Sequence, residues 1–125
     1  MSTFREIFLV EQKKNVLILT PKGDTAGFYD HDVEDQAKAL FEQVDEPKVK
    51  HILIDFSHAS YFGSLIIGLV IRLEKQISEK GGKLVLAEVS EPMQHMLDSM
   101  KLQDKLPSFV NRKLALKELK KQPQL

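Results

Sequence analysis

The sequence predicts a single α/β domain with a mixed, mostly parallel β-sheet, an antiparallel hairpin at its start and about four flanking helices. Short apolar runs of strand length alternate along the chain with segments whose apolar residues recur at helical spacing. At 125 residues the chain has the length of one domain, so we assign residues 1–125 to one unit that ends in a polar tail at about residues 122–125.

The predicted hairpin is formed by the apolar runs at residues 4–10 and 15–20, with the polar residues 11–14 as its turn. A helix is expected to begin near Asp30, because apolar residues then recur at helical spacing, and to end before Pro47. The apolar positions of this helix are Val33, Ala37, Leu40, Phe41 and Val44.

Residues 51–56 form a nearly continuous apolar run, which is typical of a strand that is covered on both faces. A helix over residues 65–80 follows and is closed by Gly81 and Gly82. Because another apolar run occupies residues 83–89, we expect the two runs to be adjacent parallel strands with the helix crossing between them.

The last third of the chain predicts two more helices and a short strand. Ser90 can cap a helix that has Pro92 in its first turn, where the missing N–H of proline is tolerated. Residues 108–110 are a candidate strand, and Asn111 can cap the final helix. The methionines Met93, Met96 and Met100 lie on one face of the first of these helices, where we interpret them as core residues rather than a binding groove.

The composition excludes several classes of protein. Basic and acidic residues both number 18, so no overall positive charge is available to attract nucleic acid. The absence of cysteine excludes disulfides and cysteine metal sites. No apolar run approaches the length of about 20 residues that a membrane span needs. We therefore predict a cytoplasmic protein with no bound nucleic acid and no membrane insertion.

No combination of residues supports catalysis, a metal or a cofactor. The four histidines lie on different predicted elements. The acidic residues around Asp30 are explained by the dipole at a helix start, and Lys22-Gly23-Asp24-Thr25 lacks the remaining residues of a phosphate-binding loop. Nucleophilic catalysis has no support beyond Ser64 itself. We predict a protein that is not an enzyme, and turnover of a phosphate ester or acyl substrate would contradict this.

The helix at residues 65–80 has more apolar residues than one buried face requires. At about 100° per residue, Ile66, Leu69, Val70, Leu73 and Ile77 form the core face. Ile67 and Ile71 project away from that face, beside Ser64 and Gly68. One interpretation is an exposed docking patch for a protein partner. The other is that a further element, such as the C-terminal helix, covers these residues. The Ser64 hydroxyl can also cap the helix.

These residues resemble the STAS domain of anti-sigma-factor antagonists. The resemblance extends over essentially the whole chain, in the order and spacing of its segments. The segments that carry it are residues 52–57, 59–64, 80–87 and 90–102. In that family, a serine at the turn from strand to helix is phosphorylated by an anti-sigma factor that is also a serine kinase, and the unphosphorylated form binds this kinase.

The resemblance implies that Ser64 is the phosphorylated serine and that Asp55 is the family's aspartate at the end of the central strand. It also implies that the protein partner is a serine kinase of the anti-sigma type. We predict that this partner binds Gly63 and Ser64 at the turn and Ile67, Gly68 and Ile71 on the outward side of the helix. The sequence differs from the family pattern beside the serine, because Gly63 replaces an aspartate, Leu65 replaces a second hydroxyl residue and Ile66 replaces a glycine. An alternative is therefore an adaptor or scaffold subunit of a transporter or signalling assembly that is not phosphorylated.

Overall fold

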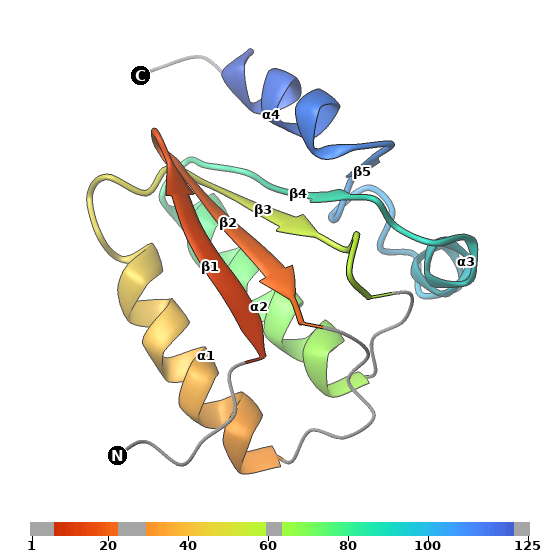
Figure 1. Ribbon diagram of the computed structural model, residues 1–125, viewed down its shortest axis with the longest axis horizontal. Helices are drawn as coiled ribbons and strands as arrows, with labels where there is room; N and C mark the ends of the chain where they lie inside the picture. Colours follow the sequence, from red (N-terminus) through yellow and green to blue (C-terminus); the bar gives the residue numbers. More distant parts are fainter. Residues whose placement is uncertain (1–6, 23–29, 60–63, 122–125) are drawn as a thin grey trace.

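The computed structural model describes residues 7–22, 30–59 and 64–121, and these form one sheet with helices on both of its faces (Figure 1). For residues 30–32 and 64–65 it describes only the backbone. In chain order the elements are β1 (Phe8–Lys13), β2 (Val16–Pro21), α1 (Asp30–Val44), β3 (His51–Asp55), α2 (Ser64–Glu79), β4 (Leu84–Ala87), α3 (Glu91–Ser99), β5 (Ser108–Phe109) and α4 (Arg112–Lys120).

The five-stranded sheet has the order β1-β2-β3-β4-β5. β1 and β2 are antiparallel, and every other neighbouring pair is parallel. Ile54 of β3 lies opposite Leu86 of β4, and α2 is the connection between these two strands. The predicted mixed sheet with an initial hairpin, and the predicted parallel pair at its centre, are therefore confirmed.

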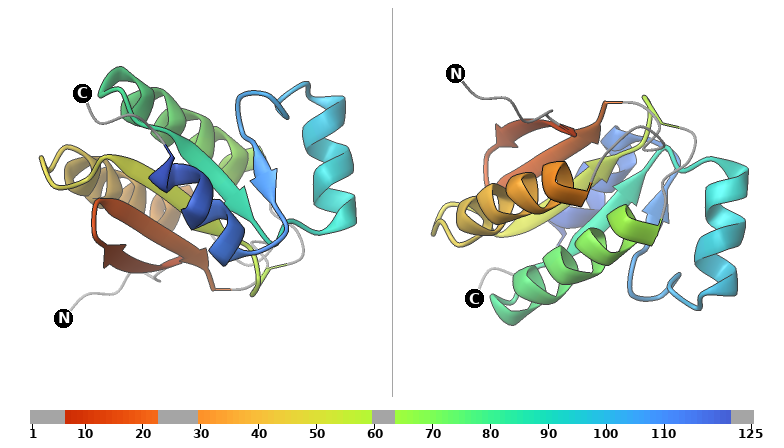
Figure 2. Two further views of the ribbon diagram at one scale, coloured as in Figure 1. Left: turned by 90° about the horizontal axis from the view of Figure 1, so that it is seen from above. Right: turned by 90° about the horizontal axis from the view of Figure 1, so that it is seen from below.

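Helices cover the two faces of the sheet unequally. α1 and α2 pack side by side on one face, α4 lies across the opposite face, and α3 lies beyond the edge strand β5 (Figures 1 and 2). Alternate residues of β2 consequently enter different cores: Leu17 and Leu19 pack on the side of α1 and α2, whereas Val16 and Ile18 pack on the side of α4. This double burial explains the nearly continuous apolar strands in the sequence.

The start of the hairpin differs from the prediction. We expected residues 11–14 to form the turn, but β1 continues to Lys13 and the turn lies at Lys14 and Asn15. Lys14 adopts a positive φ of 53°, which suits a tight hairpin turn. Because β1 is an edge strand, its polar residues remain exposed within the strand and discourage pairing with another chain.

The predicted helix caps of the last third of the chain are present. The Ser90 hydroxyl accepts a hydrogen bond from the Met93 N–H, and the Asn111 side chain accepts one from the Leu114 N–H at 2.9 Å. Met93 is fully buried, as predicted for the core, whereas Met100 is exposed at the end of α3. The caps stabilise α3 and α4, the two short helices in the last third of the chain.

The junction after α2 is held by contacts with the end of α1. The Lys80 ammonium donates hydrogen bonds to the backbone oxygens of Val44, Glu46 and Val49. Gly81 adopts φ 84°, the left-handed conformation that commonly ends a helix. The two closing glycines predicted from the sequence thus lie where α2 turns sharply into β4.

Candidate functional site

The candidate site lies at the carboxyl end of β3, where the chain crosses to α2. Asp55 is the last residue of β3 and Ser64 is the first residue of α2. In open α/β sheets, ligands commonly bind at this edge. Gly63 and the side chain of Ser64 lie outside the described residues, so the predicted capping by the Ser64 hydroxyl stays a prediction.

Ile67 is buried, so the interpretation of an exposed docking patch is wrong for this residue. Its side chain is 3% exposed and belongs to the core cluster that also contains Met93, Leu97 and Leu106. Ile67 and Glu74 lie about two turns apart and so share one flank of α2. The Glu74 carboxylate forms an ion pair at 3.8 Å with Lys105, which lies in the segment between α3 and β5. The flank is therefore covered from the side of α3, and the C-terminal helix that we considered lies on the other face of the sheet.

The opposite flank of α2 faces α1. The Arg72 guanidinium lies 3.3 Å from the Glu34 carboxylate and 5.2 Å from the centre of the Phe41 ring. The Gln76 amide donates hydrogen bonds to the Phe41 carbonyl and the Asp45 carboxylate, each at 2.9 Å. These contacts fix α2 between two neighbours and leave a narrow exposed strip along its length.

We call this strip the α2 ridge, which consists of Gly68, Ile71, Lys75 and Ser78. Gly68 is exposed, whereas Ile71 is half-buried and packs against the core. A Cβ atom added to Gly68 would meet no atom within 4 Å. Of the predicted apolar patch, the structure therefore leaves Gly68 and part of Ile71 accessible and removes Ile67.

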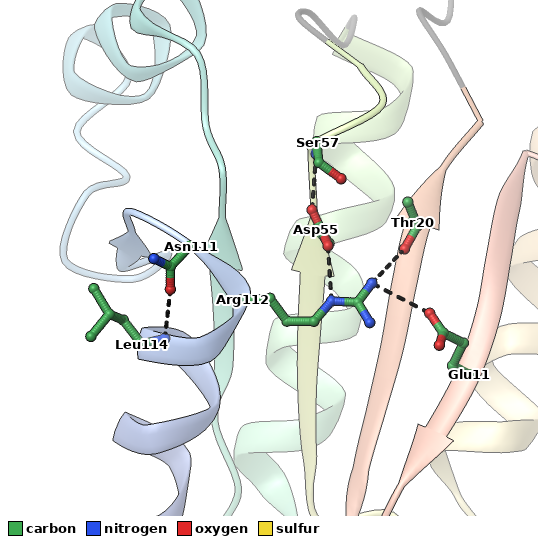
Figure 3. A network of polar contacts seen from close by, with 7 residues as sticks. All are labelled: Glu11, Thr20, Asp55, Ser57, Asn111, Arg112 and Leu114. Atoms are coloured by element: carbon green, nitrogen blue, oxygen red, sulfur yellow. Dashed lines mark hydrogen bonds and ion pairs between the residues drawn. The ribbon is translucent and has the colours of Figure 1, made fainter.

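The carboxylate of Asp55 is the centre of a polar network that the sequence did not predict (Figure 3). Asp55 is 4% exposed and accepts hydrogen bonds from the Ser57 N–H and from Nε of Arg112, both at 2.9 Å. The same guanidinium contacts Glu11 at 3.3 Å and the Thr20 hydroxyl at 3.4 Å. Arg112 thereby connects α4 with β1, β2 and β3 beside the candidate site.

Two opposing effects act on the pKa of Asp55. Burial alone raises this pKa, but hydrogen bonds from Ser57 and the hydrogen bond and positive charge of Arg112 outweigh burial and lower it below its ordinary value. Asp55 is therefore a carboxylate at neutral pH, and its charge is compensated within the protein. The contacts of Asp55 with Ser57 and Arg112 therefore anchor the end of β3, from which the chain crosses to α2.

We predict that Asp55→Asn lowers the free energy of unfolding by about 2 kcal/mol at neutral pH, because it leaves Arg112 without its most buried partner. The pKa of Asp55 is lower in the folded than in the unfolded chain. Its stabilisation is therefore complete above about pH 4 and is lost as the pH falls through the lower, folded-state pKa. Urea unfolding between neutral and acidic pH measures this dependence.

The control for this prediction is Glu11→Gln, which removes the more exposed carboxylate from the same guanidinium. It should cost less than about 0.5 kcal/mol. The difference in stability between the wild type and Asp55→Asn should shrink below about pH 4. A difference that grows as the pH falls would contradict the lowered pKa of Asp55.

His51 lies at the other end of β3, away from the candidate site. It is buried, and its Nδ1 atom accepts a hydrogen bond from the Lys83 N–H at 3.1 Å. Burial, together with the nearby charges of Lys50 and Lys83, lowers the pKa of His51. The His51 ring is therefore neutral at neutral pH. Its hydrogen bond joins β3 to the residue before β4, which is a structural role.

Among the described residues, no group of three or more histidine, aspartate or glutamate side chains is arranged to hold a metal ion. Nor does any helix in that part of the chain have the length and apolar character needed to cross a membrane. The chemical features of the site are thus the start of α2, the α2 ridge beside it and the compensated carboxylate of Asp55.

Comparisons with known proteins agree with this fold. The family model of the STAS domain matches residues 8–115. The chain is 26% identical over 111 residues to the anti-sigma F factor antagonist of Paenibacillus polymyxa, and the match covers 88% of this chain and 92% of that protein.

Two solved structures show the same fold. A Thermotoga maritima protein determined by NMR has a TM-score of 0.80 at 18% identity, with 97% of this chain and 94% of that chain covered. The anti-sigma factor antagonist SpoIIAA of Bacillus, in its unphosphorylated form, has a TM-score of 0.75 at 17% identity, with coverages of 90% and 96%. A structure of phosphorylated SpoIIAA matches as well, with a TM-score of 0.69.

Proposed function

Because the chain belongs to the STAS domain family, we propose that it is an anti-sigma-factor antagonist that binds a serine-kinase anti-sigma factor through the start of α2. The contact surface comprises Gly63, Ser64, Gly68 and the accessible part of Ile71. Ile67 supports this surface from below, since its side chain is buried. Phosphorylation of Ser64 releases the partner.

The observation that carries this proposal is Gly68. Glycine in the interior of an exposed helix costs about 0.5–1 kcal/mol relative to alanine. The fold gives no reason for this cost, because a Cβ at this position would meet nothing within 4 Å. A partner whose backbone or side chains approach the helix closely provides the reason. The position of Gly68, about one turn after Ser64, brings that approach next to the proposed phosphorylation site.

The start of a helix suits a serine that is phosphorylated and dephosphorylated. The unpaired N–H groups and the helix dipole stabilise a phosphate at this position, so the modification does not have to disturb the fold. A partner that covers the start of α2 around Ser64 and Gly68 would, however, have to remove water from the added charge. Phosphorylation therefore weakens binding while the domain stays folded.

One feature of the sequence favours a second candidate, the adaptor that is never phosphorylated. Gly63 and Leu65 replace an aspartate and a hydroxyl residue of the family pattern on either side of Ser64. Without the aspartate, the kinase has one fewer group to orient the hydroxyl or a bound metal. Genes beside that of this protein distinguish the candidates: a small kinase gene supports the antagonist, and transporter genes support the adaptor.

We predict that Gly68→Ala raises the free energy of unfolding by about 0.5–1 kcal/mol, because alanine favours the helix and its Cβ has open space. Gly68→Gln should also fold at least as stably as the wild type, yet bind the kinase at least about tenfold more weakly, because its side chain blocks close approach. Urea unfolding and titration calorimetry with anti-sigma kinases from the same genome measure the two effects.

Ser78→Gln is the matched control, since Ser78 is an exposed residue at the far end of the α2 ridge. It should leave kinase affinity within about twofold of the wild type. If Gly68→Gln binds the kinase as tightly as the wild type, the start of the α2 ridge around Gly68 is not part of the contact surface.

A further inference from the structure

A basic pocket lies on the face of the sheet opposite α1 and α2. It is an open pocket lined by the tip of the β1–β2 hairpin and by α4, and its volume is about 950 Å³. Figure 2 shows α4 alongside the hairpin on this face. The cationic side chains that line the pocket are Lys13, Lys14, Arg112, Lys113, Lys117 and Lys120.

The positive charge of this pocket is largely uncompensated. Arg112 is paired with Asp55 and Glu11, but among the described residues the lysines of the pocket form no ion pair. None of the residues that line the pocket is acidic. The whole chain has a formal net charge of zero, so this concentration of one sign is local to the pocket.

The floor of the same pocket is apolar. Val16 and Leu119 are buried beneath it, and Leu116 is half-buried on the side of α4. Along α4, Leu116 lies between Lys113 and Lys117, with Lys120 one further turn along the helix. A ligand that fills the pocket therefore meets a row of positive charges at its rim and aliphatic carbon at its base.

We propose that this pocket binds an acidic amphipathic segment of a protein partner, with carboxylates on the lysines and aliphatic side chains on the floor. The row from Lys113 to Lys120 extends about 10 Å along α4, farther than a single phosphate group reaches. A bilayer is flat and does not reach the floor of a pocket. Nucleic acid bases stack on aromatic side chains, and none lines this pocket.

α4, which lines the pocket, and α2 lie on opposite faces of the sheet (Figures 1 and 2), so the pocket is remote from the α2 ridge. A partner in the pocket would therefore leave the start of α2 accessible. The site goes beyond the proposed function and does not depend on it, because nothing in its structure involves Ser64 or a kinase. It would allow the protein to join two partners at once.

The test is the anisotropy of a fluorescein-labelled helical peptide of glutamate, leucine and alanine, titrated with the full-length protein. Replacing every glutamate of the probe by glutamine should weaken binding at least about tenfold, and so should Lys117→Gln combined with Lys120→Gln. The control is Lys38→Gln with Lys48→Gln, which changes exposed lysines outside the pocket and should keep affinity within about twofold. Circular dichroism verifies that each variant is folded.

Competition identifies the class of ligand. An oligothymidylate of equal charge, and vesicles of phosphatidylglycerol and phosphatidylcholine, should displace the peptide at least about tenfold less effectively than the unlabelled peptide does. Displacement by either competitor that is stronger than displacement by the unlabelled peptide would overturn the proposal. So would binding of the glutamine probe that is as tight as binding of the glutamate probe. Equal losses in the pocket variant and the control variant would show that the peptide binds elsewhere and would also overturn it.

Discussion

Gly82→Ala is expected to destabilise the fold by about 4 kcal/mol, which is at the upper end of the effects of single substitutions. A Cβ at this position would lie 1.7 Å from the backbone oxygen of Lys50 and 3.1 Å from the side chain of Ile77. The Lys50 backbone cannot move away freely, because its N–H donates to the Asn15 carbonyl at 2.8 Å. Urea unfolding at neutral pH measures the loss.

The neighbouring glycine provides the control. Gly81 has a positive φ of 84°, but a Cβ there would meet no atom within 4 Å. Gly81→Ala should therefore cost only about 1 kcal/mol, from the strained backbone alone. If both variants lose the same stability, the close contact between the α2–β4 turn and Lys50 is not what requires Gly82.

Ser64→Asp is expected to lower the affinity for the proposed kinase partner at least about a hundredfold while the free energy of unfolding stays within about 1 kcal/mol of the wild type. The carboxylate is favoured by the helix start, so the fold tolerates it. A partner that binds at the start of α2 would have to desolvate the charge, so its affinity falls. Titration calorimetry and urea unfolding measure the two quantities on the same samples.

Ser64→Asn is the matched control, because it has the size of aspartate without the charge. It should retain kinase affinity within about tenfold of the wild type, and Ser64→Ala should bind as well as the wild type. Equal losses for asparagine and aspartate would show that size alone excludes the partner, and the argument from phosphate charge would then be wrong.

The fold was predictable because its signals are local in the sequence. The buried strands β3 and β4 appear as continuous apolar runs, and Ser90 and Asn111 cap their helices within the next few residues. The order of these elements then restricts the sheet to a parallel centre. The turn at Lys14 was misplaced because polar residues are equally compatible with an exposed edge strand and with a turn.

The candidate site was less predictable because it depends on neighbours that are distant in sequence. A helical projection showed that Ile67 lies off the core face, but not that the segment around Leu106 covers that flank of α2. The interaction of Asp55 with Arg112 joins residues that are separated by 57 positions. The only available signal was that a carboxylate at the end of a buried strand needs a partner.

The basic pocket could not be predicted from the sequence, for a related reason. Its lysines come from the hairpin and from the last helix, at opposite ends of the chain, and the overall charge of zero gave no indication of them. Only the packing of α4 on the sheet brings Lys13 and Lys14 near Lys117 and Lys120.

The most direct test of the proposed function is to incubate the protein with ATP, magnesium and each candidate anti-sigma kinase from the same genome, and to analyse residues 61–72 by mass spectrometry. We predict one phosphate in this segment, located on Ser64, and its absence from Ser64→Ala. Phosphate at another residue would contradict the assignment of Ser64. No phosphate with any kinase, together with unchanged partner binding by Ser64→Asp, would contradict the switch and leave the adaptor as the function.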